Sequence, residues 1–162
     1  MSGIIEILEL PSPIYHLPIM KMIFEDLDAW KKARELVNAV YAITRRSSLV
    51  KDFGLCGQIQ GAAVSAMSNV AEGFERQHTA EKLQAYNVAR ASCGEVRSLL
   101  YVIGDNYPQD SAVALDTRNL VAEAGSLISG LIGSTRKRLI AKAGGTMALI
   151  SLLSWVGIHL VI

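Results

Sequence analysis

Residues 55–74 read LCGQIQGAAVSAMSNVAEGF and carry a clear helical pattern. Apolar side chains recur there at steps of three and four, at Leu55, Ile59, Ala62, Ala66, Val70 and Phe74. Because an α-helix turns once in 3.6 residues, this spacing places them along one face. Small residues are frequent in the same segment, which favours a close approach to a second helix. The segment therefore predicts an amphipathic helix packed tightly against another helix.

Three more helices are predicted from the same kind of pattern. The chain has no proline between residues 19 and 107, so no residue there forces a helix to break. Apolar residues at helical spacing predict a first helix over about 24–47, a third from about 79 to 103 and a fourth from about 111 to 138. The interruptions are RSSLVKDFG (46–54), Gly73 followed by RQHT (76–79), and GDNYPQD (104–110). The expected fold class is all-α, an antiparallel up-down four-helix bundle, because four amphipathic helices joined by short loops must bury their stripes against each other.

Composition divides the chain into three parts. Residues 1–22 contain three prolines and are expected to be a poorly ordered extension, while residues 23–138 form the bundle. Residues 139–162 form an apolar C-terminal tail, in which no Lys, Arg, Asp or Glu occurs from residue 143 onward. We expect Gly144 and Gly145 to separate this tail from the fourth helix.

The tail has three interpretations. It is barely long enough to cross a bilayer core of ~30 Å, and basic residues precede it. Insertion in a membrane is not favoured, because two serines, Gly157 and His159 interrupt the apolar run. The alternatives are an extra helix packed on the bundle or an oligomer interface, and a sequence extension that carries no selected function.

Composition also limits the function. The chain has 162 residues, 51% of them hydrophobic, with 16 basic and 15 acidic side chains and a net charge of +1. These values indicate one globular domain and exclude a disordered chain. Two cysteines, Cys56 and Cys93, fit a reducing cytoplasmic location. The three histidines are scattered, so we predict no catalytic residue, no cofactor, no metal site and no enzymatic activity.

Polar residues recur where the second and third helices are expected to meet. If the chain folds back near residue 78, the polar positions of the second helix lie opposite those of the third. Polar side chains on a buried seam are costly unless they are paired. We therefore expect a helix-seam network that fixes the register of the two helices, formed by Ser65, Asn69, Glu72, Arg90, Ser92 and Glu95.

Three segments resemble a known family. They are FEDLDAWKKARELV (24–37), QIQGAAVSAMSNVAEGFER (58–76) and ARASCGEVRSLL (89–100). They are similar to the bacterial four-helix-bundle proteins named after the protein encoded in 23S rRNA intervening sequences. The resemblance implies an up-down bundle and a ring-like homo-oligomer, a pentamer. The related accessory variability determinant of diversity-generating retroelements shares that fold and is a non-enzymatic partner of a reverse transcriptase and its RNA.

The chain departs from the family pattern at several positions. Gln60 and Gly61 stand where relatives usually have two arginines, which removes two positive charges per subunit. Met67 replaces a common proline, and Ala91 replaces a common glycine. Because phosphate contacts determine how affinity depends on salt, the first change bears directly on nucleic-acid binding.

The leading functional prediction is a cytoplasmic, non-enzymatic, oligomeric scaffold that associates with structured RNA or a ribonucleoprotein. The alternatives are an accessory protein of a retroelement reverse transcriptase and a membrane-tethered adaptor that uses residues 143–162. The candidate nucleic-acid contacts are the basic residues of the first helix and of the end of the fourth. They are Lys31, Lys32, Arg34, Arg45, Arg46, Arg136, Lys137 and Arg138.

Overall fold

The protein is all-α over residues 22–159, the part of the chain that its computed structural model describes. The predicted extension at residues 1–22 lies outside this part, apart from Met22. Four α-helices and two short 3-10 helices occur in the described part, and it contains no strand. In chain order they are the 3-10 helix Phe24–Asp26, α1 (Asp28–Thr44), α2 (Phe53–Glu75), α3 (Thr79–Asn106), the 3-10 helix Pro108–Asp110 and α4 (Ser111–His159).

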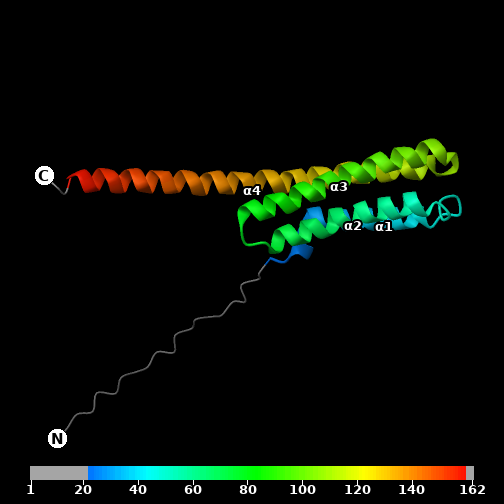
Figure 1. Cartoon of the computed structure of the whole chain (residues 1–162), viewed down its shortest axis with the longest axis horizontal. Coiled ribbons are helices and arrows are strands. Elements are labelled where there is room, and N and C mark those ends of the chain that lie inside the picture. The colour runs from blue at the N-terminus through cyan, green and yellow to red at the C-terminus, as the bar shows by residue number, and fades with distance from the viewer. Residues whose placement is uncertain (1–21, 160–162) are drawn as a thin grey trace, which may run out of the picture.

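The four helices surround one apolar core. Each of α1 and α3 packs against both α2 and α4, and the chain turns back at each of its three connections (Figure 1). The apolar stripe predicted for residues 55–74 is confirmed in its centre, where Ile59, Ala62, Ala66 and Val70 are buried. The largest fully buried apolar side chains are Leu36, Val40, Ile43, Leu49, Ile59, Val70, Val96, Leu100, Ile103 and Ile128.

The first helix is shorter than predicted. The interval 24–47 was expected to be one helix, but Leu27 has an extended backbone (φ −68°, ψ 123°) that separates the 3-10 helix from α1. Asp26 closes the short 3-10 turn through its side chain, which accepts a 3.1 Å hydrogen bond from the backbone nitrogen of Ile23. That local hydrogen bond competes with helix formation, because an aspartate side chain that binds a nearby backbone group offers the chain an alternative to the helix.

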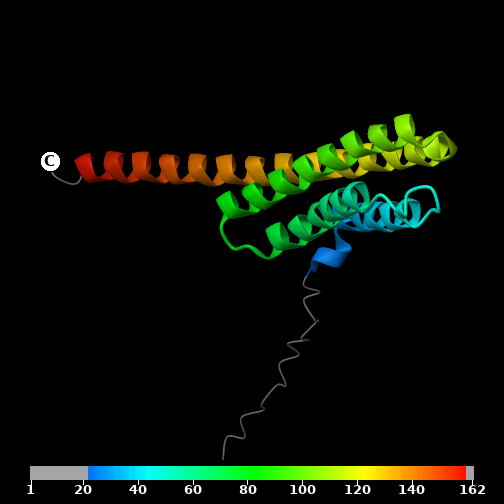
Figure 2. The same ribbon diagram turned by 45° about the vertical axis from the view of Figure 1, so that its right-hand side comes forward.

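The tail is not separated from the fourth helix, contrary to the sequence prediction. α4 continues from Ser111 to His159 without a break at Gly144 and Gly145. A glycine in a helix costs about 1 kcal/mol relative to alanine, which good helix formers on both sides offset. Figure 2 shows that the C-terminal part of α4 projects well beyond the other three helices. Within residues 22–159, no helix is both long and apolar enough to span a membrane.

Asp52 links the first and third connections, which lie at the same end of the bundle. Its carboxylate caps α2 by accepting a 3.1 Å hydrogen bond from the backbone nitrogen of Leu55. It also accepts a 2.8 Å bond from the hydroxyl of Tyr107, which follows α3. The Leu55 bond, and then the Tyr107 bond, lower the pKa of Asp52 below its ordinary value of 3.8. The same contact raises the pKa of Tyr107.

This lowered pKa predicts a pH-dependent contribution to stability. A carboxylate whose pKa is lower in the folded state stabilises the protein above its unfolded pKa, and the contribution is lost as the pH falls through the folded value. We therefore expect Asp52→Asn to have a lower melting temperature than the wild type at pH 7. Thermal unfolding from pH 7 to pH 2 should show this difference shrinking below about pH 4. A difference that stays constant into acid would contradict this account of Asp52.

Candidate functional site

Three of the six residues predicted to form the helix-seam network meet between α2 and α3. The hydroxyl oxygens of Ser65 and Ser92 lie 2.9 Å apart. The Asn69 amide nitrogen donates to the Ser65 hydroxyl at 3.2 Å and to the Ser65 carbonyl oxygen at 2.9 Å. Ser92 also donates to the carbonyl oxygen of Val88 at 3.0 Å. This small network joins the two helices near the middle of the seam.

The other three predicted network residues lie outside the seam. Glu72 bonds to Arg76, the residue that follows α2, and both side chains are half-exposed. Arg90 and Glu95 are exposed on α3. The reason is the rotation of α3 about its axis, which turns Ala89, Ser92 and Val96 toward the core and Arg90 and Glu95 toward solvent.

At Gly73 the backbone of α2 lies directly against the Tyr86 side chain of α3, a contact that the sequence pattern did not predict. A Cβ atom at Gly73 would lie 2.4 Å from Cε1 and 2.6 Å from Cδ1 of Tyr86. The Tyr86 ring is buried, with 3% of the residue exposed, so it has little room to move. Gly73 was interpreted as marking the end of the second helix, but α2 continues to Glu75. A glycine three residues after buried Val70, on the same face, was the available signal for this contact.

Three of the predicted nucleic-acid contacts are engaged by carboxylates of the protein. Lys31 lies 3.9 Å from Asp28. The ammonium of Lys32 lies 2.7 Å from Glu35 and 3.2 Å from Glu123 of α4, and these hydrogen bonds raise the pKa of Lys32. Arg46 forms an ion pair with Asp110.

Asp110 makes Arg46 part of the bundle architecture. Asp110 is fully buried (0% exposed), and its carboxylate accepts hydrogen bonds from the Arg46 Nε and from the hydroxyl of Ser48. Its backbone nitrogen donates to the carbonyl oxygen of Tyr107 at 2.8 Å. The cluster therefore ties the connection between α1 and α2 to the start of α4.

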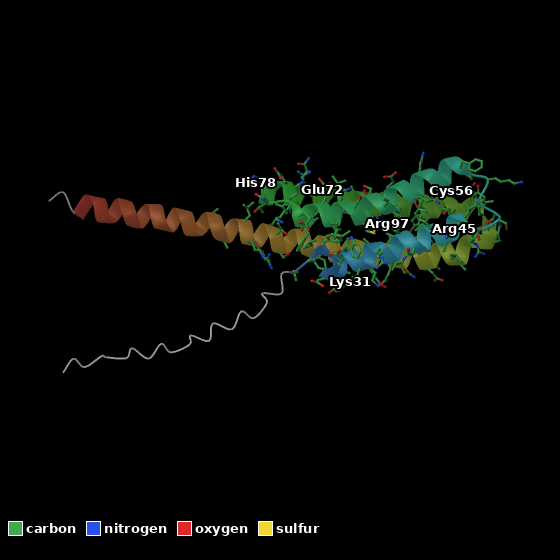
Figure 3. The ribbon with its side chains drawn as sticks, turned by 90° about the horizontal axis from the view of Figure 1, so that it is seen from below. Lys31, Arg45, Cys56, Glu72, His78 and Arg97 are labelled. Carbon is green, nitrogen blue, oxygen red and sulfur yellow. The ribbon has the colours of Figure 1, made fainter. Side chains whose placement is uncertain are left out.

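Five of the predicted nucleic-acid contacts are exposed and have no carboxylate partner among the described side chains. The guanidinium groups of Arg34 and Arg45 lie 5.7 Å from the ring centres of Trp30 and Tyr41, respectively. Figure 3 shows Lys31 and Arg45 toward opposite ends of α1. Arg136, Lys137 and Arg138 are exposed where α4 leaves the bundle. Arg97, which the sequence pattern did not single out, is exposed on α3 and likewise has no carboxylate partner in this part of the chain.

The surroundings of both cysteines favour the protonated thiol over the thiolate. Burial raises the pKa of the Cys93 thiol to about 11. Burial, and then the charge of Asp52, raise the pKa of Cys56, whose sulfur lies 3.3 Å from the carbonyl oxygen of Leu49. Within residues 22–159, no group of His, Cys, Asp and Glu side chains could hold a metal ion.

The fold and these side chains define a class: a protein whose residues 22–159 are all-helical, with four α-helices, a small polar seam inside and basic side chains outside. The chain belongs to the 23S rRNA-intervening sequence protein family, which it matches over residues 25–130. It also resembles the 1.70 Å crystal structure of a protein of unknown function from the S23 ribosomal protein family of Bacteroides thetaiotaomicron. The TM-score is 0.59 at 18% identity, over 65% of this chain and 95% of that one, which shows a shared fold. A search of curated proteins finds no match.

Proposed function

We propose that the protein is a non-enzymatic, cytoplasmic scaffold that forms a homo-oligomer and associates with structured RNA or a ribonucleoprotein. The subunit of this scaffold is an antiparallel up-down four-helix bundle. The observation that carries the proposal is a set of exposed cations that have no carboxylate partner in the described part of the chain. The chain also belongs to a family named for 23S rRNA.

The placement of these cations favours an extended polyanion over a small ligand. Arg34 lies on α1 and Arg45 follows its last residue, so the two are 11 residues apart, or about 16 Å along the helix axis. Residues 136–138 form a second basic group where α4 leaves the bundle. A nucleic-acid backbone presents phosphates over such distances, and each neutralised phosphate releases counterions and adds affinity.

Exposed apolar side chains support self-association. Ile140 is 70% exposed and Phe53 is 80% exposed. A shallow, mainly apolar groove also lies on α3, lined by Leu83 and Val88 of α3 and by Leu139 of α4. Large exposed apolar patches are typical of protein interfaces, because monomers rarely leave them in water. We propose five subunits, the number that the family resemblance implies.

The test combines native mass with RNA binding. Native mass spectrometry of the purified full chain should give a multiple of the 17.5 kDa subunit. Binding of a structured RNA should weaken linearly with the logarithm of the salt concentration, with a slope of about −0.7 to −0.9 per phosphate contacted. A monomeric mass would contradict the oligomer. Affinity at low salt no higher than that of an uncharged polymer would contradict the RNA association.

A matched pair of variants sharpens this test. Arg34→Gln/Arg45→Gln removes two cations without carboxylate partners, whereas Lys31→Gln/Arg76→Gln removes two cations that are already paired. Both variants lower the charge of the subunit by two. We expect the first to weaken RNA binding more, since paired cations contribute less to a phosphate contact.

Recovery of the full chain with membranes instead of the soluble fraction would favour the membrane-tethered alternative.

A further inference from the structure

An open groove of about 450 Å³ runs between α3 and α4 on the outer surface. One wall carries Asn87, Arg90, Gly94 and Arg97 of α3, and the other includes Gly125 and Ser126 of α4. Neither the seam between α2 and α3 nor the basic residues predicted on α1 belong to it. Its lining combines positive charge, small side chains and neutral hydrogen-bonding groups.

The groove concentrates positive charge that no described side chain neutralises. Arg90 and Arg97 both line it, and no Asp or Glu does. Neither arginine forms an ion pair, a side-chain hydrogen bond or a ring contact with the described residues, although Lys31, Lys32, Arg46 and Arg76 all have carboxylate partners there. Guanidinium groups bind phosphate oxygens with paired N–H donors, so this pair suits a phosphate ligand.

The space between the two arginines is open. Gly94 lies four residues after Arg90 and three before Arg97, so it shares their face of α3. A Cβ atom at Gly94 would have no neighbour within 4 Å, and Gly125, on the α4 wall of the groove, also has no side chain. A phosphate group can therefore reach the level of the helix surface between the arginines. The Asn87 amide and the Ser126 hydroxyl offer further donors.

We propose that this groove binds the phosphodiester backbone of RNA through Arg90 and Arg97. The inference rests on the proposed RNA association and names its site. The two arginines are seven residues apart, about 10.5 Å along the axis, which exceeds the span of one phosphate group and suits successive phosphates. No aromatic side chain lines the groove, so it has no platform for stacking bases and the contact is independent of sequence.

The charge test compares two double variants of the full chain. Arg90→Gln/Arg97→Gln should weaken binding of a structured RNA at low salt by about tenfold or more, and should reduce the salt slope by about 1.4 to 1.8. Lys31→Gln/Arg76→Gln removes the same charge from paired positions and should change binding much less. Equal effects of the two variants would overturn the groove, because net charge alone would then explain the loss.

The space test leaves every charge in place. Gly94→Leu fills the groove, and the open surroundings of Gly94 predict an unchanged or higher melting temperature. Gly61→Leu makes the same change at another exposed helical glycine with no neighbour within 4 Å. We expect Gly94→Leu to weaken RNA binding several-fold and Gly61→Leu to leave it unchanged, with both variants retaining the native mass. RNA affinity unaffected by Gly94→Leu would overturn the groove.

Tripolyphosphate, an anion without nucleobases, distinguishes a wrong assignment of the groove as the binding site from a wrong proposal of RNA association. If RNA binds equally to the wild type and to all groove variants, the RNA association stands and the groove is overturned. If the wild type binds no RNA, the RNA association and its phosphodiester occupant both fail. NMR titration with tripolyphosphate then judges the groove as an anion site. Amide shifts at residues 90–97 that Gly94→Leu abolishes would support that site, and their absence would overturn it.

Discussion

Arg46→Met should lower the free energy of unfolding by about 3 kcal/mol, because it leaves a fully buried carboxylate without its cation. Asp110 would keep only the Ser48 hydroxyl as a side-chain donor. The Arg46 side chain is 46% exposed, but Asp110 is fully buried, so without Arg46 its carboxylate has lost its hydration and keeps a single side-chain hydrogen bond in return. Chemical denaturation at a fixed protein concentration measures the effect.

The neighbouring residue provides the control for this prediction. Arg45→Met makes the same substitution one position earlier, where the exposed guanidinium only covers the ring of Tyr41. We expect a loss of about 0.5 kcal/mol there, the usual size of an exposed cation–π contact. Equal losses at the two positions would mean that the contact with Asp110 contributes nothing specific to stability.

Gly73→Ala should destabilise the protein by about 2 kcal/mol, although alanine is the better helix former. The added methyl group would lie 2.4 Å from the Tyr86 ring, closer than real Cβ contacts come. Overpacking of this kind costs about 1–3 kcal/mol, of which helix propensity recovers at most about 1 kcal/mol. Urea denaturation should show the transition at a lower midpoint with an unchanged slope.

The same substitution at Gly61 should have the opposite sign. A Cβ atom at Gly61 meets no atom within 4 Å, so Gly61→Ala changes helix propensity alone. It should stabilise the protein by about 0.5–1 kcal/mol. If Gly73→Ala proves as stable as Gly61→Ala, α2 and α3 are farther apart at Tyr86 than the structure places them.

The sequence predicted the helices well because their determinants are local. Periodicity over residues 55–74 placed Ile59, Ala62, Ala66 and Val70 on one face, and all four are buried. Folding the chain back near residue 78 predicted Ser65 beside Ala91, and the hydroxyl of the next residue, Ser92, lies 2.9 Å from that of Ser65. The prediction failed at Gly144 and Gly145, because their penalty as helix formers is small against the helical preference of the residues around them.

The candidate site was less predictable, because it depends on how the helices are rotated and spaced. The pattern assigned Arg90 to the seam, whereas the rotation of α3 turns it into the groove with Arg97. It treated Arg46 as a nucleic-acid contact, but a carboxylate 64 residues away binds it. No local signal predicts a pairing over that separation.

The sequence by itself determined four helices, their apolar faces and the family to which they belong, since helical spacing and short motifs are properties of neighbouring residues. Only the tertiary structure decided which arginines have carboxylate partners and that the Tyr86 ring packs directly against Gly73. It also decided that a groove lies between α3 and α4. The physical reason is that helix periodicity specifies a face but leaves open both the rotation of that face and the distance to its neighbour. Those two quantities follow from packing side chains of the whole bundle into one core.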